Sequence, residues 1–328
     1  MEKSKVQFSI LNSQFSIIKV ASVNKKFGEL EALKNISFEV SKGEIFGLIG
    51  PDGAGKTTLF RILTSLILAD SGTAFVDGLD VVKDYAELRK HIGYMPGRFS
   101  LYQDLSVEEN LSFYATIFNT TIQENYYLIK DIYQHIEPFK HRRAGKLSGG
   151  MKQKLALSCA LIHKPAVLFL DEPTTGVDPV SRKEFWEMLR RLKNDGITIV
   201  VSTPYMDEAN LCDRIALIQN GQIFSIETPE NIVKQFPKKL YKLESDNNYL
   251  LLEELRTNPQ IESVVMFGDN LHATFKNDEA IKDDVQLKMD ILQFINANKK
   301  MNHPFSNIHC QLIQPSVEDC FIALNLNQ

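Results

Sequence analysis

Residues Gly50 to Thr58 have the types and spacing of a phosphate-binding loop, reading G-P-D-G-A-G-K-T-T. They fit the pattern G-x-x-x-x-G-K-[ST], in which glycines let backbone N–H groups close around phosphate oxygens. Lys56 would reach the outer phosphates, and the hydroxyl of Thr57 can take Mg²⁺. The expected binding residues are Gly50, Pro51, Asp52, Gly53, Ala54, Gly55, Lys56, Thr57 and Thr58.

The segments on either side of this loop fit the strand and helix that such a loop joins. Ile45 to Ile49 is a short apolar run typical of a buried parallel strand, and Leu59 to Leu63 suits a helix. The alternative is a Gly-rich turn that binds nothing, and the strand-loop-helix context argues against it.

Two carboxylates, Asp171 and Glu172, follow a second apolar strand at Ala166 to Leu170. Because α/β sheets bind ligands at the carboxyl ends of their strands, we expect this pair beside the phosphate loop. Asp171 would hold Mg²⁺ directly or through water, and Glu172 would orient and deprotonate the attacking water. A solvated acidic turn is the alternative, but the phosphate loop favours a catalytic pair.

Helical signals separate these two motifs. Ser106 to Glu109 is a capping box, and apolar residues at helical spacing continue beyond it. We predict a helical insert at about residues 98–146 within an α/β domain over residues 16–227. After the insert, a Ser-Gly-Gly turn at Ser148 opens another helix.

The remaining segments are a tail at residues 1–15, a linker at 228–239 and a small accessory domain at 240–328. The accessory pattern reads strand, helix, strand, strand, helix, strand, which is the order of a ferredoxin-like α+β unit. No clustered ligands occur in it, so we expect a structural or regulatory role.

Composition narrows the function classes. The chain has 328 residues, a length near that of two domains. Its 37 Lys and Arg against 41 Asp and Glu argue against a nucleic-acid partner held by bulk positive potential. Four cysteines without C-x-x-C spacing indicate neither a zinc site nor a disulfide framework. No apolar run approaches the ~18 residues of a membrane helix, and no export signal is evident, so we expect a soluble chain.

Four motifs together resemble the ATP-binding subunit of an ABC transporter. They are Gly50 to Thr57, Leu147 to Gln153, Leu170 to Pro173, and Gly176-Val177-Asp178-Pro179. The second of these, L-S-G-G-M-K-Q, distinguishes this family from other P-loop proteins, which share the first and third motifs but not this one.

This resemblance implies an ATP sandwich between two such domains. Each MgATP would lie between one P-loop and the partner's equivalent of the signature residues Leu147, Ser148, Gly149, Gly150 and Met151. Asp178 would lie in a loop that communicates between the two sites. Phe27 would stack on adenine, where the residues alone leave simple core packing as an equal alternative. Separate permease chains would supply the membrane helices, which places this chain on the cytoplasmic side of the membrane.

Two positions depart from the family pattern. After Ile92 to Pro96 the family normally has a glutamine that reaches Mg²⁺ and water, and this chain has Gly97. After the strand Ile197 to Ser202 the family normally has a histidine that donates to the γ-phosphate, and this chain has Pro204. Proline has neither a side-chain donor nor a backbone N–H. We therefore expect good MgATP binding but slow hydrolysis at this chain's own site.

A slow site favours a heterodimer with a second ABC ATPase chain that keeps its histidine. The alternative is a homodimer in which other groups replace the two missing residues. The segment Gln314 to Ile322 resembles the tail of drug-exporter subunits such as the daunorubicin-resistance group, so we expect an exporter. Two rivals are a non-transport ABC ATPase and a regulatory ATP-binding subunit with little turnover.

Overall fold

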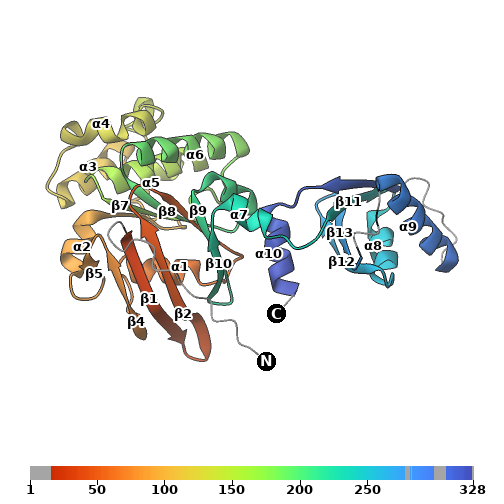
Figure 1. The fold of residues 1–328 in the computed structure, drawn as a ribbon. Helices are drawn as coiled ribbons and strands as arrows, with labels where there is room; N and C mark the ends of the chain where they lie inside the picture. The colour runs from red at the N-terminus through yellow and green to blue at the C-terminus, as the bar shows by residue number, and fades with distance from the viewer. Residues whose placement is uncertain (1–15, 278–280, 282, 299–307, 327–328) are drawn as a thin grey trace. The chain divides into compact units, whose positions relative to one another are not determined.

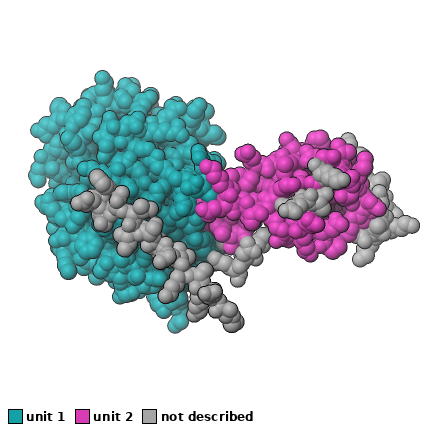
Figure 2. All heavy atoms as spheres, in the orientation of Figure 1, with its two compact units in different colours: residues 1–231 teal, residues 232–328 magenta. Residues whose placement is uncertain are grey.

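The computed structural model describes residues 16–277, 281, 283–298 and 308–326 (Figure 1). The predicted tail, residues 1–15, lies outside the described residues. The chain forms two compact units, residues 1–231 and 232–328, shown in separate colours in Figure 2. No helix in the described ranges is long and apolar enough to cross a membrane.

The first unit is built on a six-stranded sheet with the order β10-β9-β3-β8-β7-β6. All neighbouring strands run parallel except β10, which pairs antiparallel with β9 at the edge. Every residue of β3, β7 and β8 is buried, as expected for central strands of a parallel sheet. The strands span Gln222–Glu227 (β10), Arg214–Gln219 (β9), Ile45–Ile49 (β3), Thr198–Thr203 (β8), Val167–Asp171 (β7) and Ile92–Met95 (β6).

A second, antiparallel sheet in this unit has the order β2-β1-β4-β5. One apolar core joins the two sheets, and within it Phe38 of β2 stacks on Phe46 of β3 at 5.4 Å between ring centroids. This arrangement confirms the predicted α/β P-loop domain with an antiparallel subdomain. The strands span Ser16–Phe27 (β1), Leu30–Ser41 (β2), Ser71–Val76 (β4) and Leu79–Asp80 (β5).

Helices cover the parallel sheet and form the insert. The predicted capping box at Ser106 is present at the start of α3, where Ser106 Oγ accepts from the Glu109 N–H. A second capping box, Thr121 with Glu124, begins α4 and was not predicted. The helices span Lys56–Leu63 (α1), Tyr85–His91 (α2), Val107–Ile117 (α3), Ile122–Tyr133 (α4), Gly149–Leu161 (α5) and Pro179–Asn194 (α6), with 3₁₀ turns at Glu137–Phe139 and Ala144–Lys146.

The second unit has the predicted ferredoxin-like order of elements and the sheet order β12-β13-β11-β14. All three strand pairs are antiparallel, and α8 and α9 contribute to its apolar core. The elements span Leu240–Ser245 (β11), Asn248–Arg256 (α8), Ile261–Phe267 (β12), Asn270–Phe275 (β13), Asp284–Asn298 (α9) and Ile308–Ile313 (β14). The unit begins at residue 232, within helix α7 (Pro229–Lys234) of the expected linker, where Ile232 is buried.

A last helix, α10 (Val317–Leu326), was not predicted from the sequence. Its Asp319 is buried and accepts a hydrogen bond from Ser316 Oγ at 2.6 Å, and its other oxygen lies 2.6 Å from His272 Nδ1 on β13. Burial alone would raise the pKa of Asp319, but the hydrogen bonds from His272 and Ser316 outweigh it and lower this pKa below its ordinary value.

We expect Asp319→Asn to lower the free energy of unfolding of the second unit at pH 7 by about 1.5–3 kcal/mol, because an amide cannot accept at both positions. A carboxylate with a lowered pKa stabilises the fold above its ordinary pKa and loses this effect as the pH falls through the folded-state value. The difference between variant and native protein should therefore shrink below a pH of about 4. Hydrogen exchange of the β13 amides in the full chain measures this loss of stability. Asp290→Asn, at an exposed aspartate, is the control. A difference that persists at low pH would contradict the assigned contact.

Candidate functional site

The P-loop joins β3 to α1, and its glycines occupy positions that a side chain could not. Gly55 has φ 105°, and a Cβ on it would lie 2.5 Å from the carbonyl oxygen of Ala32. A Cβ on Gly50 would collide with the carbonyl oxygen of Ile218 on β9. Both glycines are therefore required where the loop approaches the backbone of β2 and of β9 closely.

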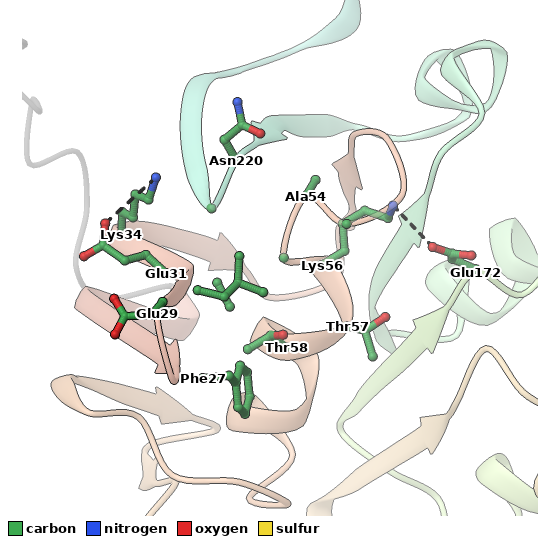
Figure 3. A pocket seen from close by; sticks show the side chains of 15 residues that line it. Phe27, Glu29, Glu31, Lys34, Ala54, Lys56, Thr57, Thr58, Glu172 and Asn220 are labelled. Carbon is green, nitrogen blue, oxygen red and sulfur yellow. Dashed lines mark ion pairs between the residues drawn. The ribbon is translucent and has the colours of Figure 1, made fainter.

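Lys56 is 3% exposed and its ammonium group is held by the loop itself. It donates to the carbonyl oxygens of Gly50 (2.8 Å) and Pro51 (3.0 Å). It also lies 3.2 Å from Glu172 Oε1, an ion pair drawn as a dashed line in Figure 3. A phosphate that binds here would compete with Glu172 for this cation.

Asp171 is buried at the carboxyl end of β7 and accepts two hydroxyl hydrogen bonds on Oδ1. The donors are Thr57 Oγ1 on α1 at 3.1 Å and Ser202 Oγ on β8 at 2.6 Å. Burial, and then the charge of Asp171, raise the pKa of Tyr94 to about 12.

Glu172 has a backbone conformation that is unusual for a residue with a side chain, with φ 50°. Its N–H donates to the carbonyl oxygen of Ser202 at 3.0 Å and lies 3.1 Å from the Ser202 hydroxyl. Ser202 therefore holds both members of the acidic pair, Asp171 through its side chain and Glu172 through its backbone. Sequence reasoning missed Ser202, although its place at the end of an apolar strand was a usable signal.

A cavity of about 630 Å³ opens over the P-loop (Figure 3). Residues 53–58 and Glu172 line one part of it, and Phe27, which is 50% exposed, lines another. Glu31, Lys34 and Asn220 also border the cavity and were not predicted, because the sequence does not reveal that β2 and the turn between β9 and β10 reach the P-loop. The Asn220-Gly221 hairpin was predicted, but its packing was not: the Gly221 N–H donates to the carbonyl oxygen of Ala54 at 3.1 Å.

The signature residues do not line this cavity. Ser148 is exposed and caps α5, where its hydroxyl accepts from the Met151 N–H at 3.4 Å. Asp178 caps α6 in the same way by accepting from the Ser181 N–H at 3.0 Å. The two caps are neighbours, since a Cβ on Gly150 would lie 3.0 Å from the Ser181 hydroxyl.

Positions 97 and 204 both lie against the acidic pair or the P-loop. A Cβ on Gly97 would lie 3.0 Å from the carbonyl oxygen of Asp171. Pro204 follows β8, the strand between β3 and β7, and the carbonyl oxygen of Thr203 accepts from the Gly50 N–H at 3.3 Å. The two departures from the family pattern therefore adjoin the residues on which hydrolysis would depend.

The donor set suits a hard cation bound together with phosphate. Thr57 and Asp171 present oxygen atoms at one point, and Mg²⁺ typically binds through one or two such groups, waters and substrate phosphates. In the described part of the chain, no three His, Cys, Asp or Glu side chains gather as they would around a metal held by protein alone. With nucleotide, Mg²⁺ at Thr57 and Asp171 would neutralise phosphate charge.

The fold and this site define a P-loop nucleotide-binding domain of the kind that hydrolyses ATP. Residues 33–175 match the ABC transporter family. The chain is 36% identical over 315 residues to the probable multidrug ABC transporter ATP-binding protein YbhF of Escherichia coli K12, which covers 94% of this chain and 52% of that protein. It is 37% identical over 219 residues to the daunorubicin resistance ATP-binding protein DrrA2 of Streptomyces coeruleorubidus, covering 66% of this chain and 68% of that protein.

Comparison with a solved structure supports the same family. The dimeric ATP-binding cassette MJ0796 bound to ADP and Pi has a TM-score of 0.59 and 26% identity, covering 64% of this chain and 98% of that chain. The chain belongs to the ABC transporter family and contains a domain similar to its ATP-binding cassettes. It spans about half the length of YbhF.

Proposed function

We propose that this chain is the energy-supplying subunit of a multi-chain exporter, in which MgATP closes a pair of ATPase domains and hydrolysis resets it. The observation that carries the proposal is a divided site. The P-loop and Glu172 line one cavity, whereas Ser148 and Gly149 are exposed and do not line it. A second chain would bring its own signature residues to this cavity, and the solved dimer of a similar cassette supports that arrangement.

The second ATPase chain is a different protein in this proposal. Pro204 offers no donor to a γ-phosphate, whereas Ser148, Gly149 and Gly150 are intact and can complete a partner's site. The pair would have one fast and one slow site. The alternative is a homodimer. Single-turnover hydrolysis distinguishes both kinds of dimer from a purely regulatory subunit, which would hydrolyse little ATP.

The permease would dock on the helical insert. α3 carries a groove of about 600 Å³ lined by Leu105, Phe113, Ile117 and several polar residues. Tyr102 packs edge-on against Phe113 at 4.9 Å and is itself exposed, so the apolar surface extends into the loop before α3. Exposed apolar patches of this kind support a protein partner. Docking there would hold the chain at the cytoplasmic side of the membrane.

Purification of the tagged chain from detergent-solubilised native membranes tests this proposal. We expect two companions: a protein with several apolar spans of about 20 residues and a second P-loop ATPase. Ile117→Asp in the α3 groove should remove the membrane protein and leave ATP affinity unchanged. Tyr249→Asp, which places the same charge at another exposed large side chain, in the second unit, is the control. A chain that stays free of membrane proteins would support a non-transport ATPase instead.

Phe27 provides a test of the base site. We expect Phe27→Ala to weaken ATP binding by about 1–3 kcal/mol, because stacking of a base on an aromatic ring has this magnitude. Equilibrium dialysis with labelled ATP measures the change. Since the ring is half exposed, its removal should leave the free energy of unfolding nearly unchanged. Equal affinities for ATP and triphosphate alone in the native protein would contradict stacking.

A further inference from the structure

A buried carboxylate, Glu208, connects the two segments that flank the acidic pair. It belongs to the 3₁₀ turn η3 (Met206–Leu211), and its side chain is 1% exposed. Thr174 Oγ1 donates to Oε1 at 2.7 Å, and Thr203 Oγ1 donates to Oε2 at 2.6 Å. Both threonines are buried, so these hydrogen bonds are shielded from water.

The first segment runs from the acidic pair to Asp178. Within it the Thr175 N–H donates to the carbonyl oxygen of Glu172 at 3.2 Å, and the Val177 N–H donates to that of Thr174 at 3.2 Å. Thr174 therefore lies within consecutive hydrogen-bonded turns that begin at Glu172, two residues earlier. Because Glu172 has a positive φ, its conformation depends on such surrounding contacts.

The second segment is the end of β8 and the turn after it. Thr203 Oγ1 accepts from the Tyr205 N–H at 3.1 Å while it donates to Glu208, so one hydroxyl fixes the backbone on both sides of Pro204. Arg182 supplies the opposite charge, with Nε 3.7 Å from Glu208 and its guanidinium 4.3 Å from the Tyr205 ring centre. A buried carboxylate needs this combination of donors and charge.

We infer that Glu208 is a positioning residue for ATP hydrolysis, which ties the Glu172 segment to the end of β8 through Thr174 and Thr203. Position 204 has no side-chain donor to make such a link. Ser202 thus joins β8 to the acidic pair directly, and the Glu208 network joins the end of β8 to the segment that follows the pair. The inference concerns the ATPase site and does not depend on the exporter proposal.

Thr174→Val tests the link with a small change that removes one hydroxyl donor. We expect single-turnover hydrolysis to slow about tenfold to a hundredfold, the effect of one hydrogen bond to a charged group, with ATP affinity unchanged. Thr174→Ser keeps the hydroxyl and should restore the native rate. Thr64→Val is the matched control, since Thr64 is also buried and donates once, to the carbonyl oxygen of Phe60 at 2.8 Å.

Hydrogen exchange tests the same link without turnover. Thr174→Val should speed exchange at residues 203–208, and Thr203→Val should speed it at residues 173–177, each across the network from the altered side chain. Glu208→Gln, which leaves one carbonyl oxygen for two donors, should affect both segments. The inference would be overturned if exchange became faster only in each variant's own segment. It would also be overturned if Thr174→Val and Thr64→Val lost turnover equally.

Discussion

Glu172→Gln is expected to slow ATP hydrolysis strongly while ATP binding becomes tighter. Hydrolysis should fall by a factor of about 10² to 10⁴, the usual contribution of a general base. Binding should improve because Glu172 lies 3.2 Å from Lys56, so its negative charge competes with phosphate for the same cation. The amide keeps the shape of the side chain but removes this competition.

Two measurements on the purified chain separate these effects. Equilibrium dialysis with labelled ATP gives the affinity, and single-turnover hydrolysis with protein in excess gives the rate. Glu187→Gln, an exposed glutamate on α6, controls for the loss of one negative charge elsewhere. Unchanged hydrolysis would exclude Glu172 as the base. Weaker ATP binding would contradict competition between Glu172 and phosphate for Lys56.

Elements with strong local signals were predictable from the sequence. Each of these signals lies within a few consecutive residues: the apolar runs of β3 and β7, the capping box of α3 and the Asn220-Gly221 hairpin. The ferredoxin-like unit was also predictable, because its strands and helices alternate in a recognisable order. These are features that neighbouring residues determine.

Contacts between distant segments were not predictable in the same way. Nothing near Glu208 in the sequence indicates that it accepts from Thr174 and Thr203, and these contacts exist only because β7 and β8 are adjacent. The helix α10 was missed for a related reason, since its first turn is fixed by His272, 47 residues away from Asp319. The Lys56–Glu172 ion pair likewise joins two motifs that lie far apart in the sequence.

Pro204→His is expected to accelerate ATP hydrolysis by a factor of about 10² to 10³, the usual effect of one preorganised donor at a transition-state oxygen. The position suits such a donor, because β8 lies between the strands that lead to the P-loop and to the acidic pair. The Tyr205 N–H to Thr203 hydrogen bond that shapes the turn does not involve the proline ring and should persist. ATP affinity should change little, since binding uses other groups.

Pro204→Ala is the matched control, because it restores the same backbone N–H as Pro204→His but adds no side-chain donor, and it should leave the slow rate unchanged. Gly97→Gln should be less effective than Pro204→His, since a Cβ at position 97 would lie 3.0 Å from the carbonyl oxygen of Asp171 and must displace the backbone that carries the acidic pair. Single-turnover hydrolysis by the chain alone measures all three variants. The gain should vanish when Pro204→His is combined with Glu172→Gln, because the donor can help only a reaction that the base begins. Equal rates for Pro204→His and Pro204→Ala would mean that other groups already supply the missing donor, as the homodimer alternative requires.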